Sequence, residues 1–372
     1  MRVLHLVARS HRRGAEVVAL ELASALDLGG HDNDVHAIAL ATNAEEIATL
    51  PPLVRSTRLG ALTYLRSAHR LRRLLADEPV DVIVAHGGSA AVVVALAAPS
   101  APTARVWQRI LGFPEDRWGF LRRHAWAAVA RRFHGIVALT TEMEAEVRSL
   151  GFEGPVWLLP NARDPLRFAN TDRLAASAAL RAELRIGHEV PLLGFVGHLV
   201  DQKQPELAVD VLAEVRRQGH PAHLVVVGDG PRRSAVERRI RAHGLEKSVT
   251  LLGHRDDPEL IFGGVEMALI TSKSEGIPGV AIEAQMTGCP VVTFRLGAVE
   301  DVVEDGVTGV IVRCSDPLLM ARHVVALLGE PERLASMGCA AAKASGGFTT
   351  AVTAAQYAAR FADLRDGGLR IR

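Results

Sequence analysis

The residues best able to do chemistry in this chain lie on either side of a glycine-rich turn, in the run Ser274-Glu275-Gly276-Ile277-Pro278-Gly279. Two carboxylates, Glu275 and Glu283, stand eight positions apart across this turn, which precedes an expected helix over residues 279–286. Pro278 suits the first helical turn, where its missing N–H is not needed. Side chains of a helix tilt toward its N-terminus, so we expect Glu283 to lean toward the loop that carries Glu275.

The backbone of the same turn predicts an anion site. The N–H groups from Gly276 to Val280 precede or begin the helix, where they have no intrahelical partner. The positive end of the helix lies behind them. Phosphate fits these N–H groups, and sugar hydroxyls fit the two carboxylates. A molecule that carries both, such as a nucleotide-sugar, is therefore the expected ligand.

Two further residues stand where a ligand would be met. His86 ends an apolar run and precedes Gly87-Gly88, so we expect it at the carboxyl end of a strand. In open α/β sheets the carboxyl ends of parallel strands face the ligand crevice. Lys203 lies in the loop after another apolar run and is one of only four lysines, against 39 arginines. Its compact ammonium suits phosphate as a point charge. We expect both residues at the site.

The elements that position these residues alternate short β-rich runs with helical stretches, a rhythm that predicts βαβ units and parallel sheets. The expected strands of a first series are Val3–Val7, Val35–Leu40, Val80–Ala85, Ala104–Gln108, Ile136–Leu139 and Val156–Leu159. Those of a second series are Leu192–Val196, His223–Val227, Val249–Leu252, Met267–Ile270, Val291–Thr293 and Val310–Val312. The fold class is therefore α/β, with two Rossmann-like domains.

The expected domain boundaries follow from these two series. Residues 1–165 form an N-terminal domain, 191–348 form a C-terminal domain, and the polar, alanine-rich stretch 166–190 reads as a linker region. Residues 349–372 contain a final helix. A length of 372 residues suits two domains of ordinary size.

Composition excludes several classes of function. A net charge of +1 and only 16 aromatic side chains argue against nucleic acid as a partner. The three cysteines form no Cys-x-x-Cys pair, which fits a reducing cytoplasm without structural zinc. The most apolar later segment, 89–98, has about half the length of a membrane span. We expect a cytoplasmic protein; peripheral membrane contact is possible but not indicated.

The sequence after the glutamate pair makes the prediction more specific. The helix ends in Gly288-Cys289-Pro290-Val291-Val292, and Asp305-Gly306-Val307-Thr308-Gly309 follows. With Glu275 and Glu283, these motifs resemble the retaining glycosyltransferases of family 4, in the family's own order and over nearly the whole chain. The resemblance implies the GT-B fold, in which two facing Rossmann-like domains enclose a cleft and the chain end crosses back onto the first domain.

The resemblance also implies a chemistry. A nucleotide-sugar donor binds the C-terminal domain, and an acceptor of unknown identity offers a hydroxyl on the N-terminal domain. No cofactor and no metal take part. Glu283 then holds the ribose and Glu275 the sugar hydroxyls, while the amides of Gly276, Ile277 and Gly279, in the turn that contains Pro278, face the departing diphosphate beside Lys203.

Other site residues are implied by the same likeness. His86 lies beside the transferred sugar and stabilises charge through its ring or backbone. Gly14 lets the backbone of the first turn approach the donor, Gly228 belongs to a donor-side Gly-x-Gly-Pro loop, and main-chain groups of Arg255 meet the base. Asp257 could accept N–H groups of guanine, but Asp257-Pro258 is also an ordinary helix start, which we favour.

Three departures from the family pattern keep alternatives open. His198 replaces the usual diphosphate-binding arginine and is only partly charged near neutrality, Arg13 replaces a glycine, and Ile277-Pro278 is unusual. A nucleotide-sugar epimerase or a sugar phosphorylase could use the same fold. The departures at His198 and at Ile277-Pro278 also leave open a catalytically silent nucleotide-sugar-binding subunit. Asp32-Asn33-Asp34 has the form of a metal-binding Asp-x-Asp, but we interpret it as a turn.

Overall fold

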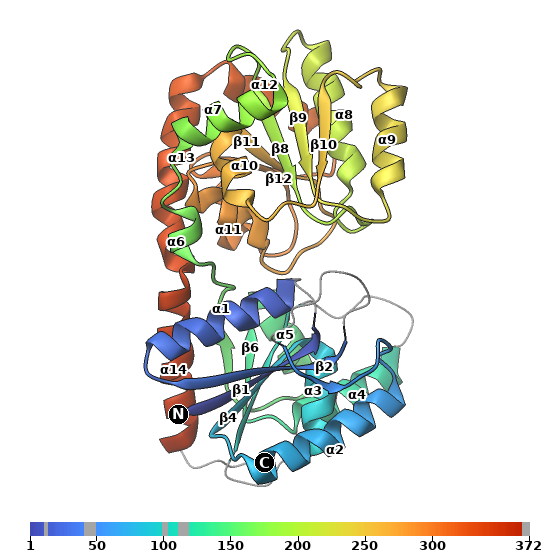
Figure 1. Ribbon diagram of the computed structural model, residues 1–372, viewed down its shortest axis with the longest axis vertical. Helices are drawn as coiled ribbons and strands as arrows, with labels where there is room; N and C mark the ends of the chain where they lie inside the picture. The colour runs from blue at the N-terminus through green and yellow to red at the C-terminus, as the bar shows by residue number, and fades with distance from the viewer. Residues whose placement is uncertain (11–13, 41–49, 99–102, 111–118, 367–372) are drawn as a thin grey trace. The chain divides into compact units, whose positions relative to one another are not determined.

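The computed structural model describes residues 1–10, 14–40, 50–98, 103–110 and 119–366. These residues divide into two compact units, Met1–Arg163 with the segment from Thr350, and Asp164–Thr349. Both are α/β, which confirms the predicted pair of Rossmann-like domains (Figure 1).

The first unit contains a parallel sheet of seven described strands, in the order β3-β2-β1-β4-β5-β6-β7. The strands are β1 Arg2–Arg9, β2 Asp32–Ala39, β3 Pro52–Val54, β4 Val82–His86, β5 Ala104–Gln108, β6 Gly135–Ala138 and β7 Val156–Leu158. The helices are α1 Gly14–Leu28, α2 Ala61–Asp77, α3 Gly87–Ala97, α4 Gly119–Ala130, α5 Thr141–Ser149 and α14 Thr350–Asp366. The order reverses between β1 and β4, which makes this pair the switch point of the sheet.

The second unit contains a parallel sheet of six described strands, in the order β10-β9-β8-β11-β12-β13. The strands are β8 Leu192–Val196, β9 His223–Val227, β10 Val249–Gly253, β11 Met267–Ile270, β12 Val291–Phe294 and β13 Gly309–Val312. The α-helices are α6 Pro165–Phe168, α7 Arg173–Leu184, α8 Pro205–Arg217, α9 Arg233–Ala242, α10 Pro258–Gly264, α11 Gly279–Met286, α12 Pro317–Leu328 and α13 Pro331–Ala344. Two short 3₁₀ helices are η1 Val299–Asp301 and η2 Ser345–Phe348. Here the order reverses between β8 and β11.

The central strands of both sheets are buried on both faces, as parallel sheets require. In the second unit Leu193, Phe195, Leu224 and Val226 pack with α8 and α12 in one apolar cluster. In the first unit α14 packs on α1 and β5, where Tyr357 and Phe361 are each 1% exposed. The final helix is thus part of the core of the first unit, as its predicted return to that domain requires.

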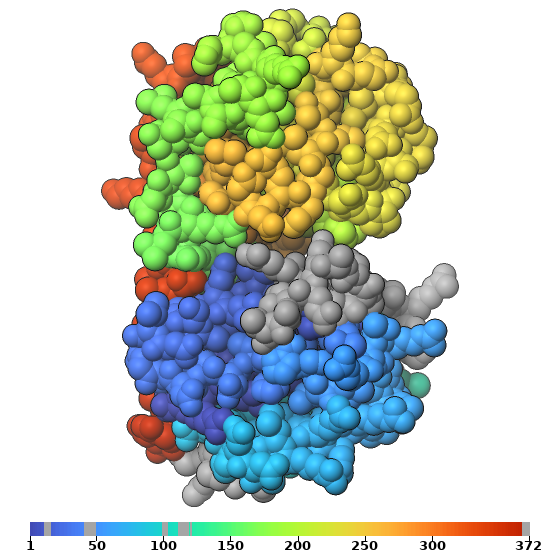
Figure 2. Space-filling model, in the orientation of Figure 1, coloured from blue at the N-terminus to red at the C-terminus, as the bar shows by residue number. Residues whose placement is uncertain are grey.

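The predicted linker region differs from the structure. Residues 166–190 contain most of α6 and all of α7, and both helices belong to the second unit. α7 packs closely on α10, and the two segments lie side by side on the surface in green and orange (Figure 2). The side-chain carboxylate of Asp172 caps α7 by accepting from the N–H groups of Leu174 and Ala175. The alanines of this stretch therefore allow close helix packing rather than a loose connection.

Two strand predictions also need correction. β3 was not predicted, because it has only three residues and begins with Pro52 at the sheet edge, where proline is tolerated. Asp32-Asn33-Asp34 is not a turn, since these residues begin β2 and pair in register with Arg2, Val3 and Leu4 of β1.

Candidate functional site

The loops that carry Lys203 and Glu275 follow the two strands at the switch point of the second sheet. β8 leads into the loop with Lys203, and β11 leads into the loop with Glu275. β8 and β11 are paired, so their carboxyl ends meet at one edge. Sheet topology therefore brings together two residues that lie 72 positions apart in the chain.

At this edge Lys203 and Glu275 form a direct ion pair between Nζ and Oε1. The Ser272 hydroxyl donates to the same carboxylate oxygen at 2.7 Å. The side chains of Lys203 and Glu275 are 24% and 12% exposed, and Ser272 is buried. The carboxylate that is expected to meet the sugar therefore also holds the ammonium at the site.

Further bonds hold the two loops against each other. The Gln202 side-chain amide donates to the Ser274 carbonyl at 2.8 Å, and the Lys273 N–H donates to the Gln202 carbonyl at 2.8 Å. The Lys273 ammonium also pairs with Asp201 at 2.7 Å. Three contacts across the two loops leave Lys203 and Glu275 little freedom to separate by loop motion alone.

Two glycines let neighbouring backbones approach these loops. Gly228 has φ of 125°, and a Cβ there would stand 2.0 Å from the Gly197 carbonyl oxygen. Gly297 has φ of 42°, and a Cβ there would stand 2.3 Å from the Glu275 carbonyl oxygen. Only glycine fits at either position. Gly228 thus supports the loop that carries His198 and Lys203, whatever contact it makes with a ligand.

The helix that follows Glu275 has the predicted bounds, since α11 spans Gly279–Met286. Pro278 differs from the prediction, because it stands just before the first helical residue with extended backbone (φ −71°, ψ 100°). Its carbonyl accepts from Ala281 N and Ile282 N, so the helix begins there. Gly276 and Ile277 are buried beside it, and Glu283 is half-buried on α11.

His198 is exposed in the same loop as Lys203, and its carbonyl accepts from Val200 N at 2.8 Å. The structure thus places the imidazole next to Gly197 at the end of β8, facing solvent.

The residues of the expected base loop are engaged with one another. The Arg255 guanidinium donates to both carboxylate oxygens of Asp257, at 2.8 and 2.7 Å, and also pairs with Glu183. These hydrogen bonds lower the pKa of Asp257 and raise that of Arg255. Asp257 is the N-cap and Pro258 the first residue of α10, so the predicted helix start is confirmed; the Asp257 side chain accepts from Arg255 instead of from an N–H group of the helix.

In the first unit His86 lies at the switch point, at the carboxyl end of β4, but its ring faces inward. The ring is buried, Nε2 lies 2.9 Å from His5 Nδ1, and Nδ1 contacts the Gln108 side-chain amide at the atom assigned as Oε1. The rings of His5 and His86 stack with centroids 5.2 Å apart. Both ring nitrogens of His86 are thus used within the protein, and the ring has no unpaired nitrogen to offer to a ligand.

Sequence reasoning missed His5 and Gln108 as partners of His86. The available signal was the polar interruption at His5 in the otherwise apolar run Val3–Val7. A buried polar side chain in a central strand requires a hydrogen-bond partner, and that requirement could have identified the pair.

Gly14 is the first residue of α1 and so lies at the strand-to-helix turn, as predicted, while Arg13 lies outside the described residues.

The two carboxylates of the Asp-x-Asp form ion pairs with Arg2 instead of converging on a cation site, with N–O distances of 3.8 Å to Asp32 and 3.2 Å to Asp34. Within the described ranges, no cluster of three His, Cys, Asp or Glu could hold a metal ion. None of the helices described is both long and apolar enough to cross a membrane.

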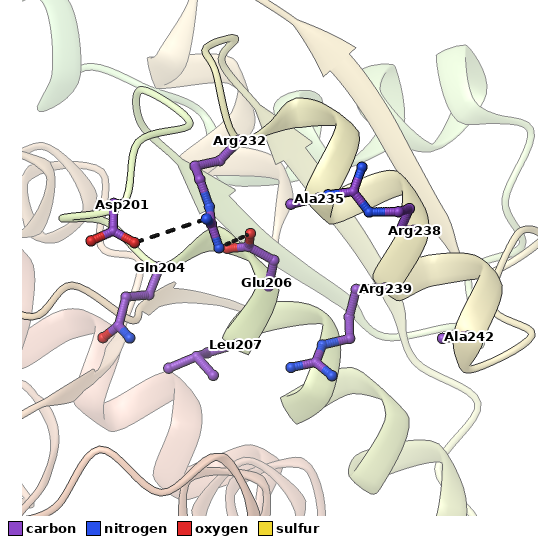
Figure 3. Close-up of a pocket in the computed structure, with 9 residues that line it drawn as sticks. All are labelled: Asp201, Gln204, Glu206, Leu207, Arg232, Ala235, Arg238, Arg239 and Ala242. Atoms are coloured by element: carbon purple, nitrogen blue, oxygen red, sulfur yellow. Dashed lines mark ion pairs between the residues drawn. The ribbon is translucent and has the colours of Figure 1, made fainter.

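A hollow of about 450 Å³ lies between α8 and α9 of the second unit (Figure 3). Its central cation, Arg232, pairs with Glu206 at 2.6 Å and lies 4.0 Å from Asp201. A second lining cation, Arg239, pairs with Asp210 at 3.1 Å. Asp201, which lines this hollow, lies in the same loop as Lys203.

Comparison with known proteins identifies relatives of both units. The family profile "Glycosyltransferase Family 4" matches residues 12–167, and "Glycosyl transferases group 1" matches residues 177–344. A D-inositol 3-phosphate glycosyltransferase of Nocardia farcinica is 33% identical over 207 residues, which cover 53% of this chain and 45% of that protein. An alpha-D-kanosaminyltransferase of Streptomyces kanamyceticus is 31% identical over 228 residues, covering 59% and 56%. The chain thus spans about half the length of these curated relatives.

Solved structures show the same fold at lower identity. Anabaena HepE in complex with UDP and glucose superposes with a TM-score of 0.82 at 21% identity, covering 98% of this chain and 100% of that one. Sucrose-phosphate synthase from Thermosynechococcus elongatus gives 0.83 at 17% identity, covering 99% and 100%.

Proposed function

Because the chain belongs to the family 4 glycosyltransferases with the GT-B fold, we propose that it transfers a sugar from a nucleotide-sugar to an acceptor hydroxyl with retention of configuration. The observation that carries this proposal is the Lys203–Glu275 ion pair at the switch point of the second sheet. Glu275 lies in the loop that leads into the N-terminus of α11. This arrangement offers a cation and backbone N–H groups to a diphosphate, and a carboxylate to sugar hydroxyls.

In the proposed reaction the acceptor oxygen attacks the anomeric carbon from the face that the diphosphate leaves. The bond between that carbon and the phosphate oxygen breaks, and the departing diphosphate takes the acceptor's proton. Lys203 and the amides before α11 stabilise the charge that develops on the diphosphate. Glu275 orients the sugar, and Glu283 holds the ribose. No side chain is required as a general base.

The relatives suggest which substrates to test first. HepE was solved with UDP and UDP-glucose, so UDP-sugars are the first donors. The name of the Nocardia farcinica relative specifies D-inositol 3-phosphate. A further relative, 29% identical over 211 residues that cover 54% of this chain and 53% of that protein, is a 2-deoxystreptamine glucosyltransferase of Streptomyces kanamyceticus. Both named compounds are cyclitols. We therefore propose a polyhydroxylated cyclic alcohol as the first class of acceptor.

The test measures release of UDP or GDP from a panel of nucleotide-sugars, with and without these acceptors, for wild type and Lys203→Ala. We expect release that requires acceptor, is weakened in the variant, and yields a product whose anomeric configuration matches the donor by NMR. Conversion of the donor sugar without acceptor would instead identify an epimerase. A rise in melting temperature without any turnover would identify a silent binding subunit.

We also propose that nucleotide binding needs no divalent metal, because Lys203 and the helix N-terminus supply the positive charge. Calorimetric titration with UDP should give the same Kd before and after EDTA treatment. Loss of binding with EDTA, and recovery with added Mg²⁺ or Mn²⁺, would contradict this part of the proposal.

A further inference from the structure

A chain of side-chain hydrogen bonds crosses the first unit beneath the switch point. Asn33 Nδ2 donates to Asp27 Oδ1 at 2.7 Å, and Asn33 Oδ1 lies 3.2 Å from His5 Nε2. His5 Nδ1 lies 2.9 Å from His86 Nε2, and the Gln108 amide contacts His86 Nδ1. The chain thus runs from an exposed carboxylate on α1 to a buried amide on β5.

The position of each proton in this chain follows from its charged end. A carboxylate accepts only, so Asn33 must turn its NH₂ group to Asp27 and its oxygen to His5. His5 must therefore carry its proton on Nε2, which leaves an acceptor at Nδ1. The facing atom, His86 Nε2, must then be protonated. Each ring carries one proton and donates toward Asp27.

Burial keeps both rings in this neutral state. His5 and His86 are 0% and 1% exposed. Desolvation is the largest cause that lowers the pKa of His5 to about 4 and that of His86 to about 3. The charged group at the end of the chain, Asp27, raises the pKa of His5 but does not offset burial. With one proton per ring, His86 Nδ1 is an acceptor, so Gln108 must present its NH₂ group there rather than Oε1.

The chain lies where it can affect a ligand. His5 is on β1 and His86 ends β4, the two strands between which the order of the sheet reverses. His86 is followed by Gly87, whose φ of 82° directs the polypeptide backbone into α3. We propose that Asn33, His5 and Gln108 are positioning residues that hold His86 as its neutral Nε2–H tautomer and so fix the backbone of the His86–Gly87 turn in the geometry that sugar transfer requires. The functional part of this inference rests on the proposed transferase activity.

The tautomer is tested without any activity measurement. Long-range ¹H–¹⁵N NMR of wild type at pH 7 should show His5 and His86 each protonated on Nε2 and not on Nδ1. In Gln108→Glu the carboxylate accepts from Nδ1, so His86 should become protonated on both nitrogens. A wild-type His86 protonated on Nδ1 would overturn the inference, whether or not the protein transfers sugar.

The positioning role is tested at His5 with a conservative rescue. His5→Leu removes the acceptor of His86 Nε2–H, whereas the amide of His5→Gln can accept from His86 and donate to Asn33. We expect kcat to fall about ten- to a hundredfold in His5→Leu, as expected when reacting groups are misplaced, with donor KM little changed and with partial recovery in His5→Gln.

If His5→Leu fails to fold, Gln108→Met gives the same test, since it removes the amide opposite His86 Nδ1 while keeping the length of the side chain. A folded His5→Leu or Gln108→Met with wild-type kcat would refute the positioning role. An inactive wild type would refute the transferase proposal, and the NMR result would still decide the tautomer.

Discussion

Replacing Glu275 with glutamine should have opposite effects on nucleotide binding and on sugar transfer. The Glu275 carboxylate holds the Lys203 ammonium, so a diphosphate must compete with an internal anion for this cation. Glu275→Gln keeps the shape of the side chain but removes the charge. Free UDP, which has no sugar for Glu275 to contact, should then bind more tightly, while transfer should fall.

The magnitude follows from the burial of the pair. Exposed ion pairs contribute about 0–1 kcal/mol, and hydrogen bonds to charged groups contribute about 1.5–3 kcal/mol. The Lys203 and Glu275 side chains, 24% and 12% exposed, lie between these cases. We therefore expect a gain of about 1–2 kcal/mol, or roughly a five- to thirtyfold lower Kd for UDP.

The assay is calorimetric titration of UDP into wild type, Glu275→Gln and the double variant Glu275→Gln with Lys203→Ala. The gain should vanish in the double variant, because it depends on the released ammonium. Lys273→Ala is the matched control. Lys273 lies in the same loop as Glu275 and pairs with Asp201 but is 48% exposed, so its loss should change Kd less than about twofold. Unchanged or weaker UDP binding in Glu275→Gln would refute the reasoning.

Three further outcomes are expected. Gly228→Ala should lower the free energy of unfolding, measured by urea titration, by about 3 kcal/mol or more, because the added Cβ would stand 2.0 Å from a backbone oxygen. The control Gly244→Ala, where φ is 65° and the added Cβ meets open space, should lower it by only about 1–2 kcal/mol. Burial of His5 and His86 lowers their pKa values to about 4 and 3, so below about pH 6.5 the unfolded chain binds protons that the folded unit does not. The free energy of unfolding should therefore be fully present above about pH 6.5 and fall by up to about 4 kcal/mol by pH 5. A urea-unfolding profile that is flat between pH 7 and 5 would contradict this. His198→Arg should raise the rate of transfer at neutral pH if the exposed ring donates to phosphate, and identical rates in His198→Arg and His198→Ala would exclude that contact.

Local sequence patterns were sufficient to predict most elements. The bounds of α11 and of β8, β9 and β11 agree with those expected, because apolar runs, turn glycines and a helix-starting proline act within a few residues. The same local signals placed Lys203 in the loop after β8 and His86 at the end of β4. They failed where the signal was short, as in the three residues of β3.

Tertiary structure alone decided which polar groups meet. Lys203 and Glu275 lie 72 residues apart, and His5 and His86 lie 81 apart. Each pair forms because the strand order of a parallel sheet reverses between two particular strands, and no local pattern encodes that order. The helical stretch 166–190 joined the second unit for a similar reason, since α7 is stabilised by packing on the distant α10. The sequence by itself therefore determined the elements and the kinds of chemistry available, while long-range packing determined the partners, because burial requires each polar group to find one wherever the fold provides it.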